Sequence, residues 1–142
     1  MFERILIPID GSQLSLKAAR QGTYIANKLK SKVVFLHVID TRTIQTSSLA
    51  GMDQAVLKAR LRNAAEKYLN EAVKLAEEEN VAFQNQIREG LPAEEILKEI
   101  DEKRMELVIM GSKGMSGAHR VIIGSTAEEV VRWSTCPVLI VR

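Results

Sequence analysis

Short apolar runs alternate along the chain with longer segments in which apolar residues recur every three or four positions. The runs at 3–9, 32–39 and 106–110 are rich in Ile, Leu and Val, as buried strands are. Segments 14–30 and 54–79 have the period of helices with one buried face. This alternation predicts β-α-β units and a parallel sheet. The inner face of the longest expected helix consists of Leu57, Leu61, Ala64, Tyr68, Ala72 and Leu75.

The remaining segments complete this pattern. Residues 81–88 alternate apolar and polar side chains, which predicts a strand at or near a sheet edge. Pro92 begins another helix, because the first turn tolerates a missing N–H. A short helix is expected at about 126–134 and a closing strand at 137–142. We expect 41–53, which is polar and rich in Thr and Ser, to be a mobile surface loop.

These elements predict an α/β fold: a doubly wound open sandwich of five strands and four helices, formed by residues 1–142 as one domain. Sheets of this kind bind ligands outside the carboxyl ends of the strands, at the point where the strand order reverses.

A glycine-rich stretch follows the apolar run that ends at Met110. Gly111, Gly114, Gly124 and Ser125 form the pattern G-x2-G-x9-G-S just before the last expected helix. Glycines let backbone N–H groups approach an anion closely, and the start of a helix adds unpaired N–H groups and the positive end of its dipole. The pattern differs from the Walker A and dinucleotide fingerprints, but it favours phosphate binding.

The residues of this stretch also have structural explanations. Thr126 with Glu129, or Ser125 with Glu128, matches a capping box. The two upstream glycines can be explained as plain turn glycines. A cap does not account for Gly124 after three apolar residues, and a cap and a phosphate site use the same N–H groups.

Similar alternatives exist for the polar residues nearby. Asp10 precedes Gly11-Ser12 at the end of the first strand, where it can form an Asx-turn, cap the next helix, or face a ligand. Lys113 can neutralise phosphate charge or be a solvated loop residue. His37 lies within a strand and is interpreted as a hydrogen-bonded structural histidine.

The glycine pattern, together with three other segments, resembles the universal stress protein family from end to end. These segments are Ile5-Leu-Ile-Pro-Ile-Asp-Gly-Ser12, Val33-Val-Phe-Leu-His-Val-Ile-Asp40 and Cys136-Pro-Val-Leu-Ile-Val141. The resemblance implies the strand order 3-2-1-4-5, with helices on both faces of the sheet. It also implies ATP binding, because members of the family with this glycine pattern bind ATP.

The resemblance further implies where the nucleotide lies. Pro8, Ile9 and Met110 would line an apolar slot for adenosine, and the backbone at Val38 would meet the adenine edge. Asp10 would approach the ribose hydroxyls or a phosphate-bound Mg²⁺, which prefers oxygen ligands. The expected nucleotide-binding residues are Pro8, Ile9, Asp10, Val38, Met110, Gly111, Ser112, Lys113, Gly114, Gly124, Ser125 and Thr126.

The amino-acid composition limits the kinds of partner that are expected. The chain has 20 basic and 18 acidic residues and 4% aromatic residues, which does not favour a nucleic-acid partner. Its single cysteine, Cys136, excludes an internal disulfide and fits a reducing compartment. No apolar run approaches the about 20 residues needed to cross a bilayer, and the N-terminus leads directly into a strand without a signal peptide. We therefore expect a cytoplasmic protein with no membrane partner.

The resulting hypothesis is an ATP-binding regulatory protein of the stress response, in which the nucleotide acts as a switch or sensor read by a protein partner. One alternative is a slow ATPase, although Asp10 and His119 are weak candidates for activating water, and no catalytic residue is assigned. The other is a nucleotide-independent dimeric adaptor. The strand Val138–Arg142 would be an apolar edge, and the resemblance implies that it pairs with its copy in a homodimer.

Overall fold

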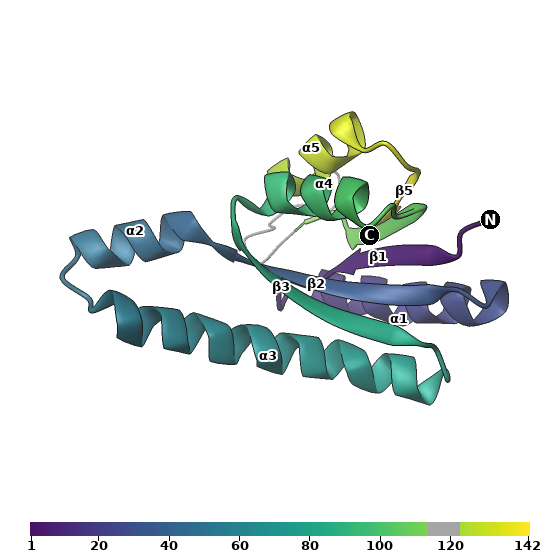
Figure 1. Ribbon diagram of the computed structural model, residues 1–142, viewed down its shortest axis with the longest axis horizontal. Helices are drawn as coiled ribbons and strands as arrows, with labels where there is room; N and C mark the ends of the chain where they lie inside the picture. Colours follow the sequence, from purple (N-terminus) through teal and green to yellow (C-terminus); the bar gives the residue numbers. More distant parts are fainter. Residues whose placement is uncertain (114–122) are drawn as a thin grey trace.

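The computed structural model describes residues 1–113 and 123–142, and within them five parallel strands form one sheet with helices on both faces (Figure 1). The strands are β1 (Arg4–Pro8), β2 (Lys32–Asp40), β3 (Phe83–Gly90), β4 (Leu107–Gly111) and β5 (Val138–Val141). The helices are α1 (Gln13–Leu29), α2 (Thr41–Leu49), α3 (Gln54–Glu78), α4 (Pro92–Glu102) and α5 (Ser125–Trp133). The doubly wound α/β fold is confirmed.

The strands lie in the order β3-β2-β1-β4-β5, as expected, and the expected strand at 81–88 lies at a sheet edge as β3. The central strand β1 pairs with β2 on one side and with β4 on the other, so that Ile5 lies beside both Val33 and Leu107. The strand order reverses between β1 and β4. A ligand of such a fold is expected outside the carboxyl ends of these two strands.

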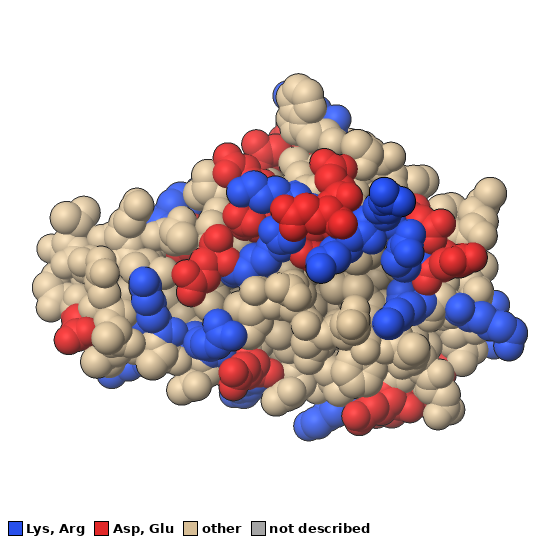
Figure 2. Space-filling view, in the orientation of Figure 1, with Lys and Arg blue, Asp and Glu red and all other residues tan. Residues whose placement is uncertain are grey.

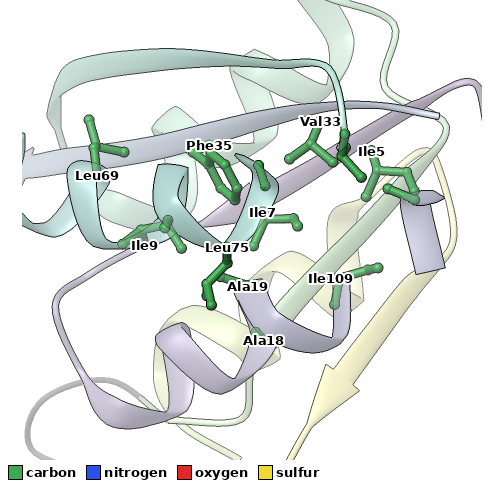
Figure 3. Close-up of a cluster of buried hydrophobic side chains, with 14 of the residues drawn as sticks. Ile5, Ile7, Ile9, Ala18, Ala19, Val33, Phe35, Leu69, Leu75 and Ile109 are labelled. Carbon is green, nitrogen blue, oxygen red and sulfur yellow. The ribbon is translucent and has the colours of Figure 1, made fainter. Parts of the chain in front are cut away.

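Alternate residues of the central strands point to opposite faces and build two cores. Ile5 and Ile7 are fully buried on the face covered by α1 and α3 (Figure 3). Leu6 and Val108 are fully buried on the other face, under α4 and α5. Because both faces are covered, the central strands contain continuous apolar runs, which is why they are so readily recognised in the sequence.

The prediction of a loop at 41–53 is wrong, because the first part of this segment forms α2. Asp40 caps this helix by accepting a backbone N–H of the first turn. Ile44 is the one buried residue of α2 and packs in a small cluster with Ile39 and Leu57. The described residues therefore contain five helices instead of four. A single apolar anchor leaves no helical period to detect in the sequence, and the packing contact decides the local structure.

The edge strand β3 is joined to α4 by an ion-pair network around Arg88. The guanidinium Nε donates to Glu99 Oε2 at 2.6 Å, and Nη1 donates to Glu95 Oε2 at 3.2 Å. Nη2 donates to Glu102, and Figure 2 shows these charges gathered where α4 overlies β3. Burial alone would lower the pKa of Arg88, but hydrogen bonds to Glu102 and Glu99 raise it. The side chain of Glu99 is only 2% exposed and depends on this partner.

Each helix in the described ranges, 1–113 and 123–142, is too short or too polar to span a bilayer.

We predict that Arg88→Met lowers the free energy of unfolding by about 3–5 kcal/mol, because it leaves the buried Glu99 carboxylate without its partner. Urea denaturation of the variant and the parent measures the loss. The control is Arg132→Met, which breaks an exposed pair with Glu128 and should cost at most about 1 kcal/mol. Equal losses in the two variants would contradict the structural role of Arg88.

Candidate functional site

The site begins with the turn that follows β1. Ile9 is still strand-like: its N–H donates to the Leu36 carbonyl at 2.8 Å, and its side chain is buried under α1 and α3 (Figure 3). Its carbonyl accepts a hydrogen bond from His37 Nδ1 at 2.7 Å. Because a carbonyl only accepts, this nitrogen carries the proton. His37 is therefore a hydrogen-bonded structural histidine, as the sequence indicated.

Asp10 follows at the surface. Its Oδ1 accepts the N–H of Ser12 at 2.8 Å, which closes an Asx-turn. Ser12, not Asp10, caps α1, with its Oγ accepting the N–H of Ser15 at 3.1 Å. Among residues 1–113 and 123–142, no group donates a hydrogen bond to Asp10 Oδ2. One carboxylate oxygen thus holds the turn, and the Asp10 residue is exposed.

Gly11, the next residue, is required by the geometry of the turn. Its φ of +88° lies in the region that favours glycine. A Cβ at this position would lie 2.6 Å from the ring of Tyr68 on α3. In the sequence, Gly11 stands out only as the neighbour of Asp10. The Asp-Gly pair is a turn signal, but the contact with Tyr68 joins distant segments and has no local signature.

The second half of the site is the end of β4. Met110 is 5% exposed and belongs to the core beneath α4 and α5, so its side chain points away from that of Ile9. A Cβ on Gly111 would lie 3.0 Å from the Cβ of Leu14 and 3.1 Å from its carbonyl carbon. Gly111 therefore allows the first turn of α1 to lie against β4. This contact brings the Asp10 turn and the end of β4 together.

Ser112 connects β4 to its neighbours. It is 5% exposed, and its N–H donates to the Val141 carbonyl at 2.8 Å. Its carbonyl accepts the N–H of Gly124 at 2.7 Å. A Cβ on Gly124 would lie 3.3 Å from both the Ser112 oxygen and the Lys113 Cα. The start of α5 is thus fixed directly against the residues that follow β4.

Both expected capping boxes at α5 are wrong. The helix begins at Ser125 after Gly124, and within the described residues no side chain caps it. Ser125 and Thr126 therefore lie inside the first turn, too late to serve as caps, because the chain already becomes helical after the close contact at Gly124. Within residues 1–113 and 123–142, no side chain occupies the first N–H groups of α5, where the positive end of the helix dipole also lies.

The remaining residues that were expected to contact the nucleotide are buried to different extents. Pro8 and Val38 are half-buried, and β2 continues past the end of β1, which places Val38 beside the site. Lys113 is half-buried next to Ser112. Gly114 and His119 lie outside the described residues.

Burial shifts the pKa values of two side chains, His37 and Cys136. Burial lowers the pKa of His37, against the raising effects of the Ile9 carbonyl and the Asp10 charge, so the imidazole is neutral near pH 7. Burial also raises the pKa of the half-buried Cys136 thiol, which makes it a poor nucleophile.

In the part of the chain that the structure describes, no three His, Cys, Asp or Glu residues are grouped to hold a metal. Two surface hollows lie elsewhere, along α3 and between α3 and β3.

Comparisons with known proteins agree on one family. The model of the universal stress protein family matches residues 1–142. Universal stress protein YxiE of Bacillus subtilis is 34% identical over 148 residues, covering all of both chains. The solved structure of MJ0577 from Methanocaldococcus jannaschii is 30% identical and has a TM-score of 0.86, covering 99% of this chain and 96% of that chain. A universal stress protein from Archaeoglobus fulgidus in complex with dAMP covers 100% of both chains, with a TM-score of 0.71; at 18% identity, it shows the fold alone.

We predict that Gly11→Ala destabilises the protein more than Gly51→Ala does. Both glycines have nearly the same positive φ, +88° and +87°, but a Cβ at Gly51 would meet nothing within 4 Å. Gly51→Ala should cost about 1–2 kcal/mol of backbone strain. Gly11→Ala should cost about 1–3 kcal/mol more because of the clash with Tyr68. Urea denaturation measures both, and the difference should vanish in a Tyr68→Ala background. Equal losses in the parent background would rule out the Tyr68 constraint.

Proposed function

Because the chain belongs to the universal stress protein family, we propose that it is a stress-response regulatory protein that binds ATP with Mg²⁺ at the carboxyl ends of β1 and β4. The observation that carries this proposal is the start of α5. This helix begins at Ser125, directly after Gly124, and no side chain of the described residues caps it; Gly124 is held against Ser112, at the point where the strand order reverses. Unpaired N–H groups in this position suit the phosphates of a nucleotide.

The donor set also fits a nucleotide-bound magnesium ion. Mg²⁺ in nucleotide sites takes one or two carboxylates and completes its shell with phosphate oxygens and water. Asp10 is exposed and uses one carboxylate oxygen to keep its turn, so we propose that the other binds the ion. Lys113 adds a positive charge beside the proposed phosphate position.

Adenosine would lie between the ends of β1 and β2. Ile9 and Met110 are 3% and 5% exposed, so we propose that they contribute mainly backbone, whereas the half-buried Pro8 and Val38 also offer apolar surface. An adenine nucleotide is further supported by the A. fulgidus protein of the same fold, which is in complex with dAMP. The triphosphate preference rests on the uncapped start of α5 and the glycine pattern.

Regulation would require that the nucleotide binds two states of the protein with different affinity. The element best placed for this is α2, which begins at the carboxyl end of β2 and has a single buried anchor, Ile44. A helix with so few buried contacts opens at low free-energy cost. We propose that nucleotide binding changes the surface that α2 presents to a protein partner.

We expect saturable binding of Mg-ATP in calorimetric titration of the nucleotide-free parent. Asp10→Asn should raise the Kd by about tenfold with Mg²⁺ present, a loss of about 1.4 kcal/mol, and should have little effect in EDTA. Asn can still accept the Ser12 N–H, so the turn is kept. Substitution at Gly124 is a poorer test, because any Cβ there would crowd Ser112 and Lys113.

Asp53→Asn is the matched control for this experiment. Asp53 also accepts backbone N–H groups, at the start of α3, and the same change of side chain there should leave the Kd unaltered. Absence of saturable binding in the parent would overturn the proposed function. Equal Kd values for the parent and Asp10→Asn with Mg²⁺ would remove Asp10 from the magnesium site.

A homodimer is a second proposal, supported by the apolar edge of the sheet at β5. Leu139 is 38% exposed on this edge strand. Two exposed apolar residues of α5, Val131 and Trp133, lie on the helix that packs beside β5. Exposed apolar edges are usually covered or paired. We propose that Val138–Arg142 pairs antiparallel with its copy about a two-fold axis.

Light scattering coupled to size-exclusion chromatography should give the mass of a dimer at micromolar concentration. Leu139→Lys should shift the protein to the monomer, because it places a charge on the paired edge. Leu49→Lys is the control: Leu49 is 90% exposed on α2, and the same substitution there should leave the mass unchanged. A monomeric parent would contradict the pairing.

A further inference from the structure

Two ring side chains that are not among the proposed nucleotide contacts hold the turn after β1. His37 comes from β2 and Tyr68 from α3. Their ring centroids lie 5.7 Å apart, with the planes tilted by 53°. This is a geometry in which aromatic rings attract each other. The two rings therefore form one contact between β2, α3 and the turn that carries Asp10.

His37 fixes the peptide group that leads into Asp10. The oxygen of this group, the Ile9 carbonyl, accepts from His37 Nδ1 at 2.7 Å. Its nitrogen, the N–H of Asp10, donates over a longer distance, 3.4 Å, to Ser15 Oγ. Strand β1 has ended at Pro8, so the Ile9 carbonyl accepts its hydrogen bond from the side chain of His37. Within the sheet, a carbonyl would accept this bond from the backbone of a neighbouring strand. The shorter of the two bonds is the one that His37 makes.

Tyr68 fixes the next residue. Its ring lies where the Cβ of any other amino acid at Gly11 would be, 2.6–2.7 Å from three ring carbons. Gly11 precedes Ser12, whose N–H is bonded to Asp10 Oδ1 at 2.8 Å. The ring therefore restricts movement of Gly11 and of the peptide between Gly11 and Ser12 toward Tyr68. A swing of this peptide would break the Asx-turn and release the Asp10 carboxylate.

We propose that His37 and Tyr68 are positioning residues that orient the Asp10 carboxylate toward the bound Mg-nucleotide, and that they make this orientation depend on the placement of α3. The inference rests on the proposed nucleotide site. His37 acts through the Ile9 carbonyl and Tyr68 through Gly11, and neither has to touch the ligand. Because α3 also packs on α2 through Leu57 and Ile44, a shift of the α2–α3 pair would reach Asp10 through Tyr68.

The first test compares His37→Leu with His37→Asn in nucleotide-free protein. Leu has a similar size but no donor, whereas the side-chain amide of Asn can place an N–H near the position of Nδ1. The readout is amide hydrogen exchange of Ser12, whose N–H closes the turn. We expect exchange about tenfold faster than in the parent for His37→Leu, as for the loss of one hydrogen bond, and near-parent exchange for His37→Asn. The Phe35 amide serves as the reference for the intact core.

The second test measures the Kd of Mg-ATP in the same variants and in two variants of Tyr68. His37→Leu and Tyr68→Leu should raise the Kd by about tenfold with Mg²⁺ present, whereas His37→Asn and Tyr68→Phe should keep it near the parent value. In EDTA the four variants should be alike, because the effect passes through the carboxylate. Rescue by Asn and Phe separates positioning from a general loss of packing.

Two results would overturn the inference. One is unchanged Ser12 exchange in both His37→Leu and Tyr68→Leu. The other is an equal effect of Leu and Asn at position 37. If the parent fails to bind Mg-ATP, the proposed function fails. The coupling to a nucleotide fails with it, while the exchange measurement still decides whether the two rings hold the turn.

Discussion

The pairing of β1 with β2 on one side and with β4 on the other is the constraint on which the rest of the structure depends. It makes β1 the central strand, buried on both faces. It also sets the point at which the helices change from one face of the sheet to the other. The chain leaves β1 and β4 at neighbouring positions, and no other pair of strands in the sheet gives this arrangement. The candidate site is therefore a consequence of topology before any side chain is considered.

The glycines at this point serve the packing of the fold as well as the proposed ligand. Gly111 lets α1 lie against β4, and Gly124 lets α5 start against Ser112 and Lys113. The absence of a side chain at a glycine would also let backbone N–H groups approach a phosphate. Architecture and binding are therefore not competing explanations of these glycines. The polar residues around these glycines can be substituted without moving the backbone. Such substitutions therefore distinguish a role in packing from a role in binding more clearly.

The sequence predicted the sheet well because its strands carry strong local signals, and the location of the site, which was inferred from the ends of those strands, stays a prediction. Val33–Leu36 and Leu107–Met110 are continuous apolar runs within β2 and β4, and Asp10 and Gly111 lie at the carboxyl ends of β1 and β4. The prediction for α2 failed because one buried residue, Ile44, gives no period. The cap of α5 could not be predicted either, because the helix starts where Gly124 contacts Ser112 and Lys113 at the other end of the glycine-rich stretch.

The inner face of α3 shows the same limit at the scale of single residues. Ala64 and Tyr68 were expected inside but are half-buried, and the adjacent Ala65 and Leu69 are buried instead. A wide apolar stripe on a long helix does not determine which of two adjacent positions points most directly at the sheet. The contact of Tyr68 with Gly11 and His37 depends on this rotation of the helix, so it becomes visible only in the structure.

The candidate site also bears on the order in which the molecule forms. The Asp10 turn is held by β2 and α3, which both precede β4 along the chain, so the first half of the site can form from contacts of shorter sequence separation than the second. The second half requires β4 to insert beside β1 across about a hundred residues, which is the slow kind of contact in folding. A ligand that bridges the two halves would bind only after this last insertion. Such a ligand would stabilise the pairing of β1 with β4, which we expect to form late in folding and to separate early in unfolding.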